Sequence, residues 1–424
     1  MKRVRRATMK TRETLKSVGP AIIVAAVVLG PGSILTSSKV GAQFGWLGVP
    51  VLAVAVILMI GMVALSARLG VVYKHSLCDE LTQRLNRSIA IAVAAVLFLI
   101  VTLFQSSNNI AVVGGLEPLF DSADSPLDSS GVRILIVVLV NALVIGSLYV
   151  MRSLYGLVEK AMKILMALMI VVFLINLLTV MVAEPVERVV ESSPSADWLP
   201  LIGMVGTTFS VAGAFFQAYL VREKGWGLRD LRKGMIDSVV GISVLGGVTA
   251  VILVTSIMVF YRTPEAAQLK SVGDVASQLE PLFGSTAKYI FAVGILAGAF
   301  SSFLVNAIIG GTVMADGLGK GRKIDDRWSR HGTAAALTVG MLIAILAFAK
   351  EGSTVGLITV AQALTVLGIP ALALALLFLA VQKDLAGERR TPPALLAVAG
   401  VGTVVAFFFA VLTAIKVWGK LTGS

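Results

Sequence analysis

The sequence offers little for disulfide, redox or acid–base chemistry. Cys78 is its one cysteine, so no disulfide can form within the chain. The two histidines, His75 and His331, both fall in polar loops, and charged residues make up 14% of the chain. We find no nucleophile–base pair, metal triad or nucleotide-binding loop in a segment large enough to hold one. We therefore expect neither an enzyme nor a bound cofactor.

The sequence is instead rich in long apolar stretches. Hydrophobic residues make up 57% of the 424 residues, and the mean hydropathy is +0.91. A helix needs about 20 apolar residues to cross a bilayer, whereas the strands of a membrane β-barrel are alternating segments of about ten. The continuous stretches therefore predict an all-α polytopic membrane protein. We place eleven spans at 18–44, 47–72, 88–113, 132–151, 155–183, 199–221, 235–260, 286–310, 333–349, 354–382 and 393–416.

The net charge of +12 is distributed unevenly between the loops. The N-terminal segment 1–17 and every second loop are basic, and the loops between them are acidic or mixed. This positive-inside pattern is typical of membrane topology and does not point to nucleic acid. We predict a plasma-membrane protein with a cytoplasmic N-terminus and, after eleven crossings, an extracellular tail at 417–424. The basic loops are 73–87, 152–163, 222–233, 320–330 and 383–390.

The first span contains a sequence that disfavours a continuous helix. Residues 27–38 read VVLGPGSILTSS, in the middle of an apolar stretch. Proline removes a backbone donor and glycine adds backbone freedom, so we predict a break over Gly30–Ser33. Carbonyls and amides released by a break find no partners in lipid and are tolerated where they line a polar cavity. The break therefore predicts a site for a polar ligand halfway across the membrane.

The first ten spans divide into two halves of five. Because five is odd, a second copy of the same unit enters the membrane from the opposite side, which is the inverted-repeat plan of many secondary transporters. The halves are 18–183 and 199–382, and an eleventh span follows at 393–416. In this plan the first helix of each half is broken. The sixth span contains glycines, Gly206 among them, that permit unwinding but would also suit close helix packing.

Four segments resemble the Nramp family of proton-coupled divalent-metal transporters. They read GPGSILTSSKVGAQFG, LSARLGVVYKHSLCDEL, FAVGILAGAFSS followed by GGTVMADG, and VAQALTVLGIPALAL, in matching order and spacing. The resemblance extends over spans 1 to 10. It implies the LeuT-type fold, an inverted repeat of five plus five helices, here with an eleventh. It also implies a secondary transporter that works by alternating access.

The resemblance implies a metal site whose residues are altered in this chain. The family has Asp-Pro-Gly-Asn in the first break, where Gly30 stands at the aspartate position and Ser33 at the asparagine position. In the sixth span, Thr207 and Ser210 stand at the family's alanine and methionine positions. The glutamine of the tenth span is retained as Gln362. The expected metal site consists of Gly30, Ser33, Gly206, Thr207, Ser210 and Gln362.

The positions that relay protons in the family are also neutral in this chain. The acidic residues of the family's third span correspond to Gln105 and Asn108, and a sixth-span histidine corresponds to Gln217. A proton relay requires groups that titrate, so we expect transport without proton coupling. Gln105, Asn108, Asn109 and Gln217 are candidates for a hydrated pathway beside the site. For the cluster in the third span, hydrogen bonding between helices is the alternative.

The remaining ligands favour a cation that keeps its water. Loss of the methionine removes a soft thioether, whereas hydroxyl, carbonyl and water ligands suit Mg²⁺, Ca²⁺ and Mn²⁺. Mg²⁺ dehydrates reluctantly and usually retains several waters. We therefore expect Mg²⁺, with Mn²⁺ as a competitor, bound weakly because no carboxylate is near. This pattern resembles the Nramp-related magnesium transporters, a branch with the same fold and an altered site.

Two other functions fit some of these features. A neutral site on the same fold could carry a small neutral or zwitterionic organic solute. Nramp-like domains also occur in membrane receptors that transport nothing, but those carry long soluble extensions, and this chain ends soon after its last span. We expect the divalent-cation carrier, embedded in the lipid bilayer as a monomer.

Overall fold

The part of the chain that the structure describes is helical, with no strand in it. The computed structural model describes residues 19–120, 126–151, 153–182, 198–263, 269, 272–277, 284–349 and 354–422. The helices of the first half are α2 (Pro20–Val28), α3 (Pro31–Phe44), α4 (Gly48–Val72), α5 (Leu77–Arg84), α6 (Arg87–Leu116), α7 (Ser130–Val150) and α8 (Leu154–Val182). Those of the second half are α9 (Leu199–Thr208), α10 (Val211–Glu223), α11 (Leu231–Phe260), α12 (Val272–Ser277), α14 (Ser285–Gly317), α15 (Arg327–Ala349), α16 (Thr354–Ala380) and α17 (Pro393–Thr422). Short 3-10 helices are η1 (Gly45–Leu47), η2 (Glu117–Leu119), η3 (Pro126–Asp128), η4 (Leu228–Asp230) and η6 (Gly387–Arg389).

All eleven predicted spans are present as helices. Nine stretches of the described residues are long and apolar enough to cross a membrane, with α3 and α4 counted together across η1. Separating α3 from α4 and adding the shorter apolar part of α16, Val366–Ala380, gives eleven. Helix α15 begins at Arg327, before the predicted start at 333, because its polar first turns continue the helix beyond the apolar stretch. The predicted N-terminal segment 1–17 and residues 423–424 of the predicted tail lie outside the described residues.

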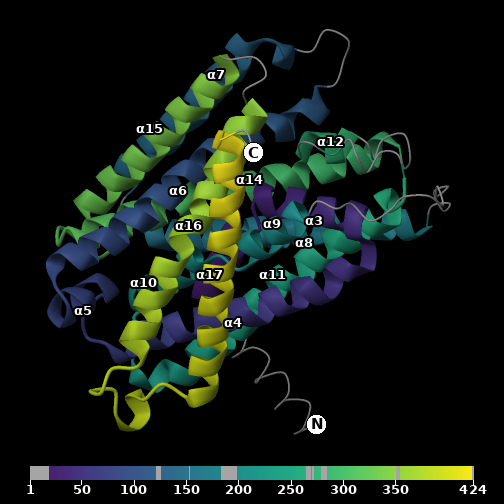
Figure 1. Ribbon diagram of the computed structural model, residues 1–424. Coiled ribbons are helices and arrows are strands. Elements are labelled where there is room, and N and C mark those ends of the chain that lie inside the picture. Colours follow the sequence, from purple (N-terminus) through teal and green to yellow (C-terminus); the bar gives the residue numbers. More distant parts are fainter. Residues whose placement is uncertain are drawn as a thin grey trace, which may run out of the picture.

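The half-helices α2 and α10 lie in the centre of the bundle. Every residue of α2 is buried, and so are residues 211–221 of α10. By contrast, α7 buries only Val137, Asn141 and Leu148, and it lies beside α15 at an edge of the molecule (Figure 1). Helix α17 packs along α16 and α4 (Figure 1). The exposed side chains of α7, such as Leu143, are apolar, which suits contact with lipid.

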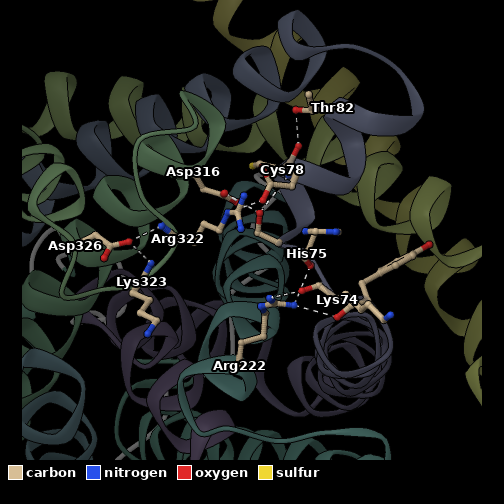
Figure 2. Close-up of polar contacts among 12 residues, drawn as sticks. Lys74, His75, Cys78, Thr82, Arg222, Asp316, Arg322, Lys323 and Asp326 are labelled. Atoms are coloured by element: carbon tan, nitrogen blue, oxygen red, sulfur yellow. Dashed lines mark hydrogen bonds and ion pairs between the residues drawn. The ribbon is translucent and has the colours of Figure 1, made fainter.

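The five basic loops meet at one end of the bundle, which we call the basic end. Arg222, near the end of α10, donates hydrogen bonds to the carbonyls of residues 73–75 at 2.8 to 3.0 Å (Figure 2). Ion pairs connect the other loops: Arg322 with Asp79 at 2.6 Å, Lys224 with Glu159 at 2.6 Å, and Arg84 with Asp384 at 2.7 Å. Helix α2 begins and α10 ends at this end, so α3 and α9 form the opposite half of their spans.

A short helix, α5, lies in the segment that the sequence analysis treats as a loop between the second and third spans. Ser76 caps it by accepting a hydrogen bond from the Asp79 amide at 3.2 Å. Acidic Asp79 and Glu80 in its first turn and basic Arg84 in its last turn suit the helix dipole. These capping signals can be recognised in the sequence. Helix α5 is nevertheless too short and too polar to be detected as an apolar stretch.

Cys78 on α5 is expected to be unreactive in the folded protein. Its side chain is fully buried, and burial, reinforced by the nearby Asp316 carboxylate, raises the pKa of the thiol well above its usual value. The thiolate is the reactive form, so both access and chemistry oppose labelling. A maleimide should label less than about a tenth of the protein in mild detergent and nearly all of it in SDS. Rapid labelling in mild detergent would contradict the buried position.

Glycines allow α14 to lie against two neighbouring helices. A Cβ atom on Gly310 would collide with the Val101 side chain of α6. A Cβ atom on Gly311 would lie 2.5 Å from the Ser329 carbonyl oxygen of α15 and closer still to the Thr333 backbone nitrogen. Small residues allow the backbones of membrane helices to approach this closely. Helix α14 is therefore held between α6 and α15.

Candidate functional site

The first predicted break is present but is shorter than predicted. Helix α2 ends at Val28 and α3 begins at Pro31, which leaves Leu29 (φ −77°, ψ 53°) and Gly30 (φ −92°, ψ −177°) between them. The sequence predicts an unwound Pro31, but this residue takes the first position of α3, where its fixed φ and missing N–H are compatible with a helix. Ser33 therefore lies in the first turn of α3 and not in an unwound segment.

The second break consists of Phe209 and Ser210, between α9 and α10. Phe209 (φ −87°, ψ 64°) has nearly the same backbone conformation as Leu29, and Ser210 is extended (φ −82°, ψ 92°). The two breaks are thus built alike, as an inverted repeat requires. Gly206, one of the glycines that permit unwinding in this span, lies with Thr207 in the last turns of α9. The helix continues past Gly206, because glycine permits unwinding without requiring it.

Direct contacts between the two repeats bracket the breaks. On the side of α3 and α9, the hydroxyl oxygens of Thr36 and Thr207 lie 3.1 Å apart. On the side of α2 and α10, a Cβ atom on Gly213 would lie 3.3 Å from the Val24 side chain and 3.5 Å from that of Val28. The broken segments of the two repeats therefore run side by side.

Exposure near the breaks is confined to the half of the spans that faces away from the basic end. The residues of α2 are all buried, and α10 is buried from its first residue through residue 221. In α3 and α9, and at the second break, Thr36, Gly206, Thr207 and Ser210 are partly exposed. Of the four residues at the breaks, Ser210 is thus partly exposed, on the side of α3 and α9, whereas Leu29, Gly30 and Phe209 are buried.

Two serines of α14 complete the first break. The Ser301 hydroxyl donates to the Ala26 carbonyl at 2.8 Å, and the Ser302 hydroxyl donates to the Val27 carbonyl. These carbonyls belong to the last turn of α2, where a helix end leaves acceptors without intrahelical partners. Neither serine stands out as a site residue in the sequence, because both lie inside a continuous span with no break and no charge beside them.

The breaks offer oxygen ligands but no acidic side chain. No Asp or Glu occurs in α2, α3 or α9, or in α10 before Glu223. The Ser33 hydroxyl is buried and has no hydrogen-bond partner among the described residues. The described residues also contain no group of three or more His, Cys, Asp and Glu side chains that could hold a metal ion. A cation at the breaks would therefore be held by hydroxyl, carbonyl and water oxygens, with help from the negative C-terminal ends of α2 and α9.

Gln362 is the predicted site residue whose side chain lies outside the described part of the chain. Its helix, α16, passes close to the second break all the same. The Val366 side chain, one turn beyond Gln362, lies 3.6 Å from the position of a Cβ atom on Gly206 in α9. The course of α16 is thus compatible with a role for Gln362, which stays a prediction.

The polar residues of the third span form hydrogen bonds with one another and with neighbouring helices. The Gln105 side chain donates to the Phe303 carbonyl of α14 at 2.7 Å, and the Asn108 amide donates to Gln105 at 2.6 Å. Asn141 of α7 donates to the Asn109 side chain at 2.6 Å. Gln105 and Asn109 thus take part in hydrogen bonds between helices, which is the alternative to a hydrated pathway. The Asn108 side-chain oxygen is buried without a partner among the described residues, which leaves this residue as the pathway candidate.

Gln217 contacts a buried carboxylate that the sequence does not mark as part of a site. Its amide donates to Asp237 of α11 at 3.2 Å. Asp237 is fully buried and also accepts the backbone amides of Gly19 and Ala21, both at 2.8 Å. The carboxylate therefore caps the N-terminus of α2, where the partial positive charge of the helix favours an anion. Its partners lie far away in the sequence, so no local pattern indicates this role.

A second buried carboxylate, Asp316 of α14, lies at the basic end near Cys78 (Figure 2). It accepts hydrogen bonds from the Ser76 hydroxyl and the Tyr219 hydroxyl, both at 2.7 Å. The three residues come from the start of α5, from α10 and from α14. Asp316 therefore joins the half-helix after the second break to the helices that surround it.

Comparison with known proteins points to one family. The family model described as Nramp, natural resistance-associated macrophage protein-like, matches residues 21–417. Relatives named divalent metal cation transporter MntH include that of Xanthomonas campestris pv. campestris, 23% identical over 92% of this chain and 88% of that protein, and that of Acidiphilium cryptum, 25% identical over 93% and 87%. Among solved structures, a manganese transporter of Eremococcus coleocola in complex with an aromatic bis-isothiourea substituted compound has a TM-score of 0.79 at 18% identity, covering 97% of this chain and 88% of that one.

These findings confirm the resemblance and the fold inferred from the sequence. The likeness to the manganese transporter extends over almost the whole chain and shows the LeuT-type fold, with its inverted repeat and paired helix breaks. The family model spans the ten helices of the repeat and most of the eleventh. This protein belongs to the Nramp family and is a multi-pass membrane transporter rather than an enzyme.

Proposed function

We propose that this transporter carries divalent metal cations by alternating access, with the ion bound between the breaks at Leu29–Gly30 and Phe209–Ser210. The observation that carries the proposal is the pair of matching breaks, each at the C-terminal end of a half-helix. Two such ends within the bundle favour a cation, because their carbonyl groups carry partial negative charge. The names of the MntH relatives and of the manganese transporter support the same class of cargo.

The chemistry of the site favours Mg²⁺, with Mn²⁺ as a competitor, in largely hydrated form. Ser33, Thr207 and Ser210 offer hydroxyl oxygens, and no thioether or carboxylate stands at the corresponding positions. Such ligands suit a hard cation, and Mg²⁺ is the one that gives up its water most reluctantly. Hydroxyl groups can hydrogen-bond to that water without replacing it. Without a carboxylate the binding is weak, with half-saturation on the order of 1 mM, which suits an abundant ion.

Transport proceeds without protons in this proposal. Gln105, Asn108 and Gln217 stand where the family has titratable residues, and amides do not titrate in this pH range. The nearest buried carboxylate to Gln217, that of Asp237, is engaged with the backbone of α2. This carboxylate therefore holds the start of α2 in place and does not take part in a proton relay.

The ion reaches the breaks from the side of α3 and α9. Partial exposure on this side and complete burial of α2 on the other support an arrangement open away from the basic end. The positive-inside pattern makes the basic end cytoplasmic, so entry is from outside the cell. An inside-negative membrane potential would then assist uptake of each charge by about 2.3 kcal/mol per 100 mV.

Uptake into proteoliposomes tests the proposal. With a Mg²⁺-sensitive dye and a pH dye inside the vesicles, we expect saturable Mg²⁺ entry with no acidification, inhibited by external Mn²⁺. Acidification in proportion to uptake would contradict the uncoupled mechanism. A lack of any divalent flux would contradict the cation proposal and favour a small neutral or zwitterionic organic solute on the same fold.

A Ser210→Met variant locates the site. A thioether at the second break is expected to shift the preference from Mg²⁺ toward Mn²⁺ by about tenfold, because soft ligands favour transition metals. The ratio of Mn²⁺ to Mg²⁺ uptake at equal concentrations measures the shift. Ser147→Met on the peripheral helix α7 is the matched control and should leave the ratio unchanged, because the Ser147 hydroxyl bonds only the Val144 carbonyl among the described residues. Equal ratios in the two variants would place the site elsewhere.

A further inference from the structure

A buried carboxylate lies between the two breaks and the basic end. Asp237 of α11 contacts Gln217 of α10, which follows Ser210 by seven residues, or about 10 Å along the helix toward the basic end. Asp237 also accepts the amides of Gly19 and Ala21 at the start of α2. An ion that leaves the breaks between α2 and α10 toward the basic end must therefore pass this carboxylate.

The negative charge of Asp237 has no basic partner in the described part of the chain. The carboxylate is fully buried, and its hydrogen bonds come from two backbone amides and the Gln217 side chain. Lys224, whose ammonium group would lie 3.4 Å from a Cβ atom on Gly19, pairs instead with Glu159 at 2.6 Å. A buried charge without a counter-charge is costly, so a cation that came within reach would bind it.

Gln217 adds a second oxygen atom at this position. Its side chain is fully buried, and its amide nitrogen donates to Asp237 at 3.2 Å. The amide oxygen has no hydrogen-bond partner among the described residues. Carboxylate and amide oxygens suit Mg²⁺ and other hard divalent cations. The pair therefore has the chemistry of a cation site whose carboxylate is occupied by α2 in this conformation.

The contacts of α2 and α10 indicate which half-helix would uncover the carboxylate. Polar bonds join α10 to its surroundings: Tyr219 donates to Asp316 at 2.7 Å, and the Ala218 amide donates to the Ser66 hydroxyl at 3.1 Å. Every side chain of α2 is apolar, and the amides at its start bond Asp237. Opening at the basic end is therefore expected to move α2 and to release Asp237 from these amides.

We infer that Asp237 and Gln217 form a second binding site for the divalent cation, an exit site that becomes available when α2 moves away from the carboxylate. Asp237 thus alternates between two positive partners, the start of α2 while the basic end is closed and the ion while it is open. The exchange exposes a negative charge only on the side toward which the ion leaves. This inference rests on the proposed function and concerns the same cargo.

Transport measured from each face tests the inference. Everted membrane vesicles present the basic end to the medium, right-side-out vesicles present the opposite end, and a dye inside the vesicles reports Mg²⁺ entry. Asp237→Asn and Gln217→Leu should each raise the KM for entry from the basic end at least about fivefold, because the first removes the charge of the exit site and the second removes its amide oxygen.

A merely structural role predicts a change of the opposite sign. If Asp237 and Gln217 only hold α2 closed, their loss favours the form open at the basic end, which would lower the KM from that end and raise the KM from the other. An unchanged or lowered KM from the basic end in both variants would therefore overturn the inference. Gln382→Leu is the matched control and should leave both KM values unchanged, because the Gln382 side chain lies at the basic end and bonds only the Phe378 carbonyl among the described residues.

Labelling of α2 is a second measurement that needs no variant at the site and no transport. Ile22→Cys places a thiol on α2 at a buried position, while Cys78 stays unreactive in the folded protein. In everted vesicles, Mg²⁺ should raise the rate of reaction of residue 22 with an impermeant maleimide at least about threefold, because the ion and α2 compete for Asp237. KCl of equal ionic strength should not. A rate that Mg²⁺ leaves unchanged or lowers would overturn the inference.

Failure of the proposed function has a different signature. It would appear as an absence of divalent flux in wild-type vesicles of either orientation. The labelling of Ile22→Cys would then still decide whether Mg²⁺ binds at Asp237. Flux that is present, with variants that transport as the wild type does from the basic end, would leave the proposed function standing and overturn the exit site.

Discussion

Replacing Asp237 by alanine is expected to remove roughly 3 to 5 kcal/mol from the free energy of unfolding and to abolish transport. The carboxylate is fully buried and accepts hydrogen bonds from the amides of Gly19, Ala21 and Gln217. Alanine would leave these buried donors unpaired, at about 1 to 3 kcal/mol each. Two of these donors are N–H groups at the start of α2, which have no partner within the helix. The substitution would therefore loosen the half-helix that covers the breaks at the basic end.

Thermal unfolding of the purified protein in detergent, with Cys78 labelling as the readout, measures the loss of stability. Asp237→Asn retains one acceptor oxygen and should lose about half as much. Asp230→Ala is the matched control, because Asp230 bonds Lys233 and the Gly227 amide in an exposed loop of the basic end, and its loss should cost less than about 1 kcal/mol. An Asp237→Ala protein as stable as the wild type would show that α2 is held by its apolar contacts alone.

Replacing Gly311 by valine is expected to prevent folding. A Cβ atom at this position would lie within 2.5 Å of backbone atoms of α15, and backbone atoms cannot rotate out of the way as a side chain can. Overpacking that side chains can absorb costs about 1 to 3 kcal/mol. Here the two helices would have to separate, which would also move Ser302 away from the first break. The expected effect is therefore larger than about 3 kcal/mol.

The labelled fraction of Cys78 after extraction in mild detergent measures this failure, and most of the Gly311→Val protein should react. Gly247→Val on α11 is the matched control, since a Cβ atom on Gly247 meets nothing within 4 Å. That variant should label as slowly as the wild type and transport normally. A folded, active Gly311→Val protein would mean that α14 and α15 can separate without loss.

Much of this fold follows from local features of the sequence. Apolar stretches locate the spans, because a helix in lipid satisfies its own backbone groups. The Gly30-Pro31 pair indicates the first break, because proline cannot continue the helix before it. Charge sorts the loops, and the five basic ones do meet at one end.

The second break shows where such reasoning becomes inexact. Gly206 permits unwinding, but the chain leaves the helix at Phe209 and Ser210. Several neighbouring residues could unwind at similar cost, and the choice among them depends on packing against neighbouring helices. Likewise, the types of Gln105 and Asn109 suggest a pathway, which stays a prediction, while their hydrogen bonds to α14 and α7 could not be read from the sequence.

Local patterns thus suffice for the class of protein, the spans, the first break and the lack of acidic side chains beside it, whereas the second break is expected from the inverted-repeat plan. They do not reveal which oxygen atoms at the breaks are already occupied. Ser301 and Ser302 reach α2 from 275 residues further along the chain, and Asp237 reaches Gly19 across 218 residues. Such contacts depend on how each helix is rotated and where it crosses its neighbours. These quantities arise when all the helices pack together, and no single stretch of sequence encodes them.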